Sequence, residues 1–93
     1  MRLDERERQA ICTPIKELDP NAAIYLFGSR TDTKKRGGDI DILIISQRIT
    51  SSDKPILLRQ IFEKIDEQKI DLVIKQDTSD PFVEYILETA IRL

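Results

Sequence analysis

A chain of 93 residues, of which 40% are hydrophobic and 34% charged, has enough apolar material for one modest core and too little for two. We therefore expect residues 1–93 to form a single domain that depends on another molecule for any large substrate. The formal charge of −2 lacks the basic excess typical of nonspecific nucleic-acid-binding proteins, so the sequence gives no strong nucleic-acid signal.

The sequence contains no histidine and one cysteine, Cys12. Histidine acid–base catalysis and histidine metal ligands are therefore excluded, and no internal disulfide can form, which fits a reducing cytoplasm. Cys12 lies in an apolar helical pattern, where buried packing is the expected role. The charged N-terminal run is unlike a signal peptide, and no apolar run approaches the roughly 20 residues needed to span a bilayer. We expect a cytoplasmic protein without a membrane segment.

Residues 3–18 have the pattern of an amphipathic helix. Asp4 is a candidate N-cap, and Glu7 three positions later completes a capping box. Pro14 interrupts the apolar stripe. We therefore expect either a kink or two short helices, with Thr13 capping the second.

Two strands are expected next, on either side of a polar loop. The segment AAIYLFG, residues 22–28, has the composition of a buried strand, and DIDILIIS, residues 39–46, is rich in β-branched isoleucine. Between them, residues 29–38 form a loop or one helical turn followed by a loop. A connection this short favours an antiparallel arrangement over a parallel crossover.

The second half of the chain supplies a helix and a third strand. Residues 51–55, SSDKP, provide caps and an early proline before an apolar helical repeat that runs to Ile65. Residues 69–75, KIDLVIK, then form the third strand. A last helix follows, so the expected fold class is α/β (α+β): a small mixed sheet covered by helices. The order is helix, strand, strand, helix, strand, helix, with room for a short helix after the first strand.

The last helix is expected to begin at Asp80 and Pro81, which suit the N-cap and the first helical position. Its apolar positions run to Ile91. Covering the sheet is the expected use of its apolar face, with docking of a partner or of a second copy as the alternative. Tyr25 and Tyr85 are expected to be packing residues, and the alternative is a position near a nucleotide base.

Three aspartates stand where strands rarely carry charge. Asp39 and Asp41 open the second strand two positions apart, so their side chains share one face. Asp71 stands inside the third strand, and pairing of that strand with the second would bring it to the same edge of the sheet. Such an all-oxygen set of donors favours a hard divalent cation, Mg²⁺ or Mn²⁺.

The residues after the first strand are candidates for binding phosphate. Gly28 lets a ligand approach the backbone closely, and Ser29 can donate its hydroxyl and N–H to a phosphate oxygen. Arg30 can clamp phosphate or hold a carboxylate in place. Each feature also has a structural explanation, as a turn, a solvated loop or an ion-pair network. Their combination with the later aspartates is far more specific than any one of them.

Together, LFGSR, GGDIDILI and IDLVI resemble the motifs of the minimal nucleotidyltransferases in the DNA-polymerase-beta-like superfamily. The resemblance implies that Gly28 and Ser29 are the phosphate-binding pair and that Arg30 occupies a basic position common in this subgroup. Gly38 stands where many members have serine before the first aspartate.

The same resemblance implies that the three carboxylates are metal ligands and catalytic residues. Asp39 and Asp41 would bridge the metal ions, while Asp71 would bind the catalytic ion and could accept a proton from the attacking hydroxyl. The implied reaction transfers a nucleoside monophosphate, AMP from ATP, with release of pyrophosphate.

The subgroup is usually encoded beside a helical HEPN-type partner, with which it forms a toxin–antitoxin pair. The resemblance therefore implies an antitoxin that adenylylates a hydroxyl of this partner. Two alternatives stay open: a noncatalytic antitoxin that occludes its partner, and a catalytic subunit acting on a small molecule or an RNA end. Homo-oligomers and hetero-oligomers are both compatible with the sequence.

Overall fold

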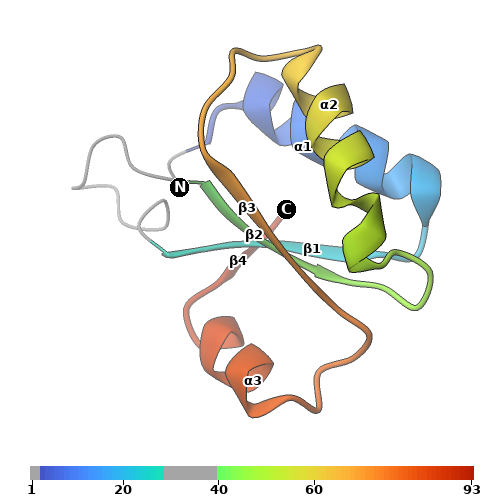
Figure 1. The fold of residues 1–93 in the computed structure, drawn as a ribbon. Coiled ribbons are helices and arrows are strands. Elements are labelled where there is room, and N and C mark those ends of the chain that lie inside the picture. Colours follow the sequence, from blue (N-terminus) through green and yellow to red (C-terminus); the bar gives the residue numbers. More distant parts are fainter. Residues whose placement is uncertain (1–2, 29–39) are drawn as a thin grey trace.

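The computed structural model describes residues 3–28 and 40–93. Helices α1 and α2 lie together on one face of a sheet, and α3 lies on the other face (Figure 1). The elements in chain order are α1 (Glu5–Leu18), β1 (Ala23–Phe27), β2 (Ile40–Ile45), the 3₁₀ helix η2 (Ser51–Asp53), α2 (Lys54–Phe62), β3 (Ile70–Lys75), α3 (Pro81–Leu87) and β4 (Ile91–Arg92).

Helix α1 begins at the predicted capping box. The backbone N–H of Glu7 donates to Asp4 Oδ1 at 2.8 Å, and the N–H of Asp4 donates to Glu7 Oε1 at 3.2 Å. The helix continues through Pro14 to Leu18 as one element, so of the two expected alternatives the pair of short helices with a Thr13 cap is wrong. Pro14 is buried, and packing of this helix face compensates for the backbone hydrogen bond that proline removes.

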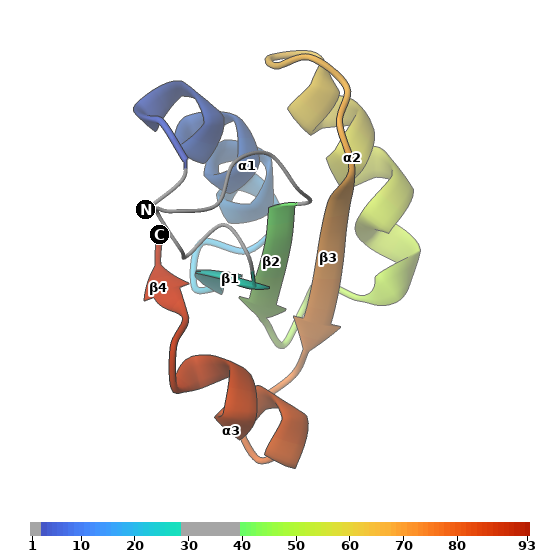
Figure 2. The same cartoon turned by 90° about the vertical axis from the view of Figure 1, so that its left-hand side faces the viewer.

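The sheet has the strand order β3-β2-β1-β4. Strand β1 pairs antiparallel with β2 and with β4, whereas β2 and β3 run parallel (Figure 2). The predicted mixed sheet is therefore confirmed. A parallel pair needs a crossover, and α2 supplies it between β2 and β3.

The C-terminal segment differs from the prediction of a helix to Ile91. Helix α3 ends at Leu87, and Ile91–Arg92 form β4, in which Ile91 pairs with Leu26 of β1. The N–H of Leu93 also donates to the Ile24 carbonyl at 2.9 Å. Apolar residues at the end of this segment fit helical spacing, but only an extended chain can satisfy the backbone groups along the edge of β1.

Two hydrophobic clusters lie on opposite faces of the sheet. The smaller one lies under α3 and consists of Leu43, Val83 and Ile86, with partly buried neighbours that include Tyr25 and Phe27. The larger one lies under α1 and α2 and contains Leu3, Ile11, Ile15, Ala22, Ile24, Leu26, Ile40, Ile42, Ile44, Ile49, Leu57, Ile61, Ile70 and Leu72.

The structure tests the expected packing of three side chains. Cys12 is half-buried against the larger cluster, as predicted, and burial raises the pKa of its thiol. Tyr25 packs against the smaller cluster, with the guanidinium carbon of Arg92 5.7 Å from its ring centroid. Tyr85 is 72% exposed, so its predicted packing role is wrong. Helix α3 directs Val83 toward the sheet, and Tyr85 falls on the other side of the helix.

A buried polar contact joins the end of α1 to the end of β2. Ser46 Oγ donates to Asp19 Oδ2 at 2.6 Å, and the Asn21 N–H donates to Asp19 Oδ1 at 2.9 Å. Chiefly the Ser46 hydroxyl, and then the Asn21 N–H, holds the pKa of Asp19 below its ordinary value. Ser46 Oγ also accepts the N–H groups of Arg48 and Ile49, so this contact fixes the turn that follows β2.

None of the helices in the described ranges has the length and hydrophobicity of a transmembrane segment.

Candidate active site

The register of β2 and β3 brings two of the three predicted carboxylates together. Asp41 and Asp71 are direct partners in the parallel ladder. Partners in neighbouring strands project from the same face of a sheet, and the strands lie about 4.8 Å apart. The register therefore places Asp41 and Asp71 side by side on one face, as expected if the third strand pairs with the second.

Strand alternation decides which face carries the carboxylates. Ile40 and Ile42 are buried in the cluster under α1 and α2, so Asp41 between them belongs to the opposite face. Leu43, two positions later on that face, is buried under α3. Asp41 is half-buried and Asp71 is exposed. The acidic end of this face can therefore be reached by a substrate.

Phe27 extends the acidic pair into a row across three strands. It pairs with Asp41 in the antiparallel register of β1 and β2, and its ring packs at the margin of the smaller cluster. Sequence reasoning did not single out Phe27. The available signal was the short connection between the first two strands, because an antiparallel pair sets residues near the end of β1 opposite the start of β2.

Gly28 follows β1 directly and lies against Asp41. Its φ angle is +76°, in the left-handed region that favours glycine. A β-carbon at this position would also overlap Asp41 Oδ2. The absence of a side chain at Gly28 therefore leaves space for the Asp41 carboxylate. This role differs from the close approach of a ligand that the sequence suggested.

The other predicted site residues, Ser29, Arg30 and Asp39, lie outside the described residues. Gly38 lies outside them as well. Within residues 3–28 and 40–93, no group of three or more histidine, cysteine, aspartate or glutamate side chains is arranged to hold a metal ion. The described part of the chain supplies two of the three carboxylates that the sequence indicated.

Asp41 and Asp71 fit a hard divalent cation in their chemistry. They are partners on neighbouring strands and project from one face, and a cation between two such carboxylates would offset the repulsion of their charges. Mg²⁺ commonly takes one or two protein carboxylates and completes its shell with water and substrate phosphates. The pair would leave most of such a shell to water and phosphate oxygens.

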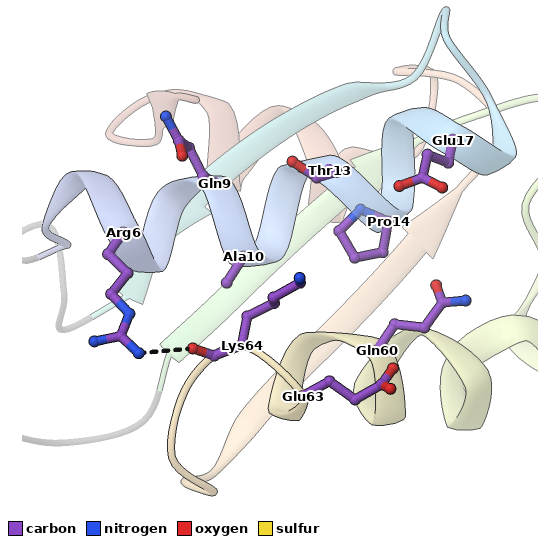
Figure 3. Close-up of a pocket in the computed structure, with 9 residues that line it drawn as sticks. All are labelled: Arg6, Gln9, Ala10, Thr13, Pro14, Glu17, Gln60, Glu63 and Lys64. Atoms are coloured by element: carbon purple, nitrogen blue, oxygen red, sulfur yellow. Dashed lines mark hydrogen bonds between the residues drawn. The ribbon is translucent and has the colours of Figure 1, made fainter.

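A separate groove of about 690 Å³ lies between α1 and α2 (Figure 3). The Arg6 guanidinium closes one end by donating to the Lys64 carbonyl at 3.2 Å. The sheet separates this groove from Asp41 and Asp71, so it is no part of the candidate active site. Its lining comprises Arg6, Gln9, Ala10, Thr13, Pro14, Glu17, Gln60, Glu63 and Lys64.

Comparison with known families adds an independent finding. A family model described as "Polymerase beta, Nucleotidyltransferase" matches residues 10–93. The matched range includes the four strands of the described sheet, together with Gly28, Asp41 and Asp71. A search of curated proteins found no match.

Proposed function

Because the chain belongs to the polymerase beta nucleotidyltransferase family, we propose that it transfers AMP from ATP to a hydroxyl group of a partner protein. Family membership establishes nucleotidyl transfer in general, and the nucleotide, ion and acceptor are our proposal. The observation that carries it is the pairing of Asp41 with Asp71 on an accessible face of the sheet.

In this proposal Asp39, Asp41 and Asp71 hold Mg²⁺, or Mn²⁺ in its place. A bound divalent cation neutralises charge on the triphosphate and on the pyrophosphate that leaves. The contact with Gly28 fixes one side of the Asp41 carboxylate. Asp71 is exposed, and it is therefore the carboxylate that an incoming hydroxyl can reach.

The proposed reaction is a direct displacement at the α-phosphorus of ATP. The acceptor oxygen forms a bond to this phosphorus, the bond to the bridging oxygen of the β-phosphate breaks, and pyrophosphate leaves. Asp71 accepts the proton of the acceptor hydroxyl. Ser29 and Arg30 bind the triphosphate, and the Gly28 backbone borders it.

We propose a helical HEPN-type toxin as the acceptor, so that the chain acts as an antitoxin and protein adenylyltransferase. One support is the sequence resemblance described above. The other is that the described residues build the sheet and the helices that cover it. An acceptor of any size must therefore come from a different molecule or segment.

Transfer of label from radioactive ATP tests this function. The purified chain is incubated with labelled ATP, Mg²⁺ and the protein encoded by the adjacent gene, and label is measured in that protein. We expect Asp41→Asn and Asp71→Asn to lower transfer by at least about 10²–10³-fold. The matched control is Asp66→Asn, an exposed aspartate before β3, which should transfer at the wild-type rate. Equal transfer by the wild type and Asp41→Asn would exclude the proposed role of the carboxylates.

Occlusion of the partner without catalysis is a second candidate. It is favoured by Phe82 and Tyr85, which are 49% and 72% exposed on α3 and offer an apolar surface away from the carboxylates. The two functions separate in a growth assay with the toxin. An Asp41→Asn protein that still neutralises the toxin supports occlusion, whereas loss of neutralisation supports catalysis.

A further inference from the structure

The two edges of the sheet differ in length and in sequence. Strand β4 closes one edge with two residues, whereas β3 forms the other edge with six. Within the described part of the chain, no strand pairs with the outer side of β3 (Figure 2). A long edge strand presents backbone N–H and C=O groups that can pair with another chain.

The ladder with β2 indicates which backbone groups of β3 face outward. The Ile40 N–H donates to the Lys69 carbonyl at 3.0 Å, and the Ser46 N–H donates to the Lys75 carbonyl at 2.9 Å. Successive residues of a strand direct these groups to opposite sides, so the odd-numbered residues of β3 direct their N–H and C=O groups toward β2. The residues that direct their N–H and C=O groups away from β2 are Ile70, Leu72 and Ile74.

The side chains of β3 are apolar except for Asp71 and Lys75. These two residues carry opposite charges and share the α3 face of the sheet, with Val73 between them. An antiparallel partner with the same sequence would place a lysine opposite each aspartate. The charge pattern of this edge is therefore complementary to itself.

We propose that two copies of this chain associate through β3, in an antiparallel and two-fold symmetric ladder centred on Val73. In this register Asp71 of each copy lies opposite Lys75 of the other, and Leu72 lies opposite Ile74. The Leu72 and Ile74 positions exchange backbone hydrogen bonds. The charged pairs and the central valines occupy non-hydrogen-bonded positions, where cross-strand side chains are closest. The two four-stranded sheets become one continuous sheet.

This association brings a cation of the second copy to the candidate active site. Within one chain, Lys75 Nζ lies 3.0 Å from Asp80 Oδ2, and the two side chains are 35% and 37% exposed. Ion pairs with this exposure are weak, so Lys75 can turn toward Asp71 of the other copy at little cost. The proposed dimer does not depend on transfer activity, and its test is separate from that of the proposed function.

Sedimentation velocity over a concentration series tests the dimer and its register. We expect wild-type protein to sediment as a concentration-dependent dimer. Lys75→Glu turns two attractive cross-strand pairs into repulsive ones and should weaken association by roughly tenfold or more. The double variant Asp71→Lys/Lys75→Glu restores opposite charges in the same register, and it should restore the dimer.

The control is Asp80→Asn, which removes the partner of Lys75 within the chain but keeps a good N-cap for α3. It should dimerise like the wild type, and circular dichroism should confirm that each variant is folded. A wild type that is monomeric at every concentration would overturn the proposal. A dimer that ignores Lys75→Glu, or a double variant that stays monomeric, would overturn it as well.

Discussion

The two faces of the sheet are built from alternate residues of the same strands, yet they are covered very differently. On one face, α1 and α2 bury a continuous aliphatic cluster that includes Ile42. On the other face, α3 buries Leu43 and its neighbours, while Asp41 and Asp71 lie beyond that cluster. Neighbouring residues of β2 therefore have different surroundings: Ile42 is part of the core, and Asp41 belongs to the candidate active site.

This difference separates the main source of stability from the candidate active site. Burial of apolar surface contributes roughly 25 cal/mol per Å², and most of the buried side chains lie under α1 and α2. The acidic end of the other face buries less apolar surface and is accessible to a substrate. Substitutions one position apart should therefore affect different properties.

The largest expected effect is on the covered face. Ile42→Ala should lower the free energy of unfolding by about 2–5 kcal/mol, because it leaves a cavity at a fully buried position. Urea denaturation measures this loss. The control is Ile56→Ala on α2, where the side chain is 42% exposed and the change should stay within about 0.5 kcal/mol. Similar losses for the two variants would show that the comparison of faces is wrong.

A second effect concerns the contact between Gly28 and Asp41. Gly28→Ala should lower the free energy of unfolding by about 1–3 kcal/mol, because the positive φ is unfavourable for alanine and the new β-carbon meets Asp41 Oδ2. The same substitution in an Asp41→Ala background should cost less, since only the backbone strain remains. Thermal unfolding of the four proteins in this cycle isolates the contact. Equal costs in the two backgrounds would assign the whole effect to the backbone.

A third effect concerns Asp19, the buried carboxylate at the end of α1 that binds Ser46. The pKa of Asp19 is lower in the folded state than its ordinary value of 3.8, so its ionised form stabilises the fold above that value. This contribution is lost as the pH falls through the lowered pKa of the folded state. Ser46→Ala removes the largest cause, and stability of the variant should then change less between neutral pH and pH values below 3.8.

Urea midpoints of wild type and Ser46→Ala across this pH range provide the measurement. The wild-type advantage should be present at neutral pH and shrink in acid. An advantage of constant size would mean that the Ser46 hydroxyl stabilises the fold without affecting the ionisation of Asp19.

The smallest expected effect is on the outer side of α3. Tyr85→Ala should change the free energy of unfolding by less than about 0.5 kcal/mol, because the side chain is 72% exposed. Val83→Ala, on the buried side of the same helix, should cost roughly 2 kcal/mol. A large loss for Tyr85→Ala in thermal unfolding would indicate that the exposed aromatic side chain stabilises α3.

Local signals in the sequence were sufficient for most of the fold. The caps at Asp4 and Asp80 fixed the starts of two helices, because their side chains bind backbone N–H groups within three residues. The period of two in the second strand placed Asp41 on the face away from Ile40 and Ile42. The short connection after β1 then predicted a mixed sheet.

Features that depend on distant contacts could not be predicted in the same way. The strand at Ile91–Arg92 exists because β1 offers an edge, which local spacing does not reveal. The exposure of Tyr85 depends on which side of α3 meets the sheet. The overlap that any β-carbon at Gly28 would make with Asp41 appears only once two strands are paired.

The pairing of Asp41 with Asp71 limits where the chain can change length. Extra residues in the connection 63–67 would enlarge a loop and leave the order of side chains in β3 unchanged. A single residue inserted between Ile70 and Asp71 would instead rotate the carboxylate to the side of α2, among aliphatic side chains that cannot solvate it. An odd number of residues inserted within β3 before Asp71 therefore moves its side chain to the other face, whereas the length of the preceding loop does not affect which face it occupies.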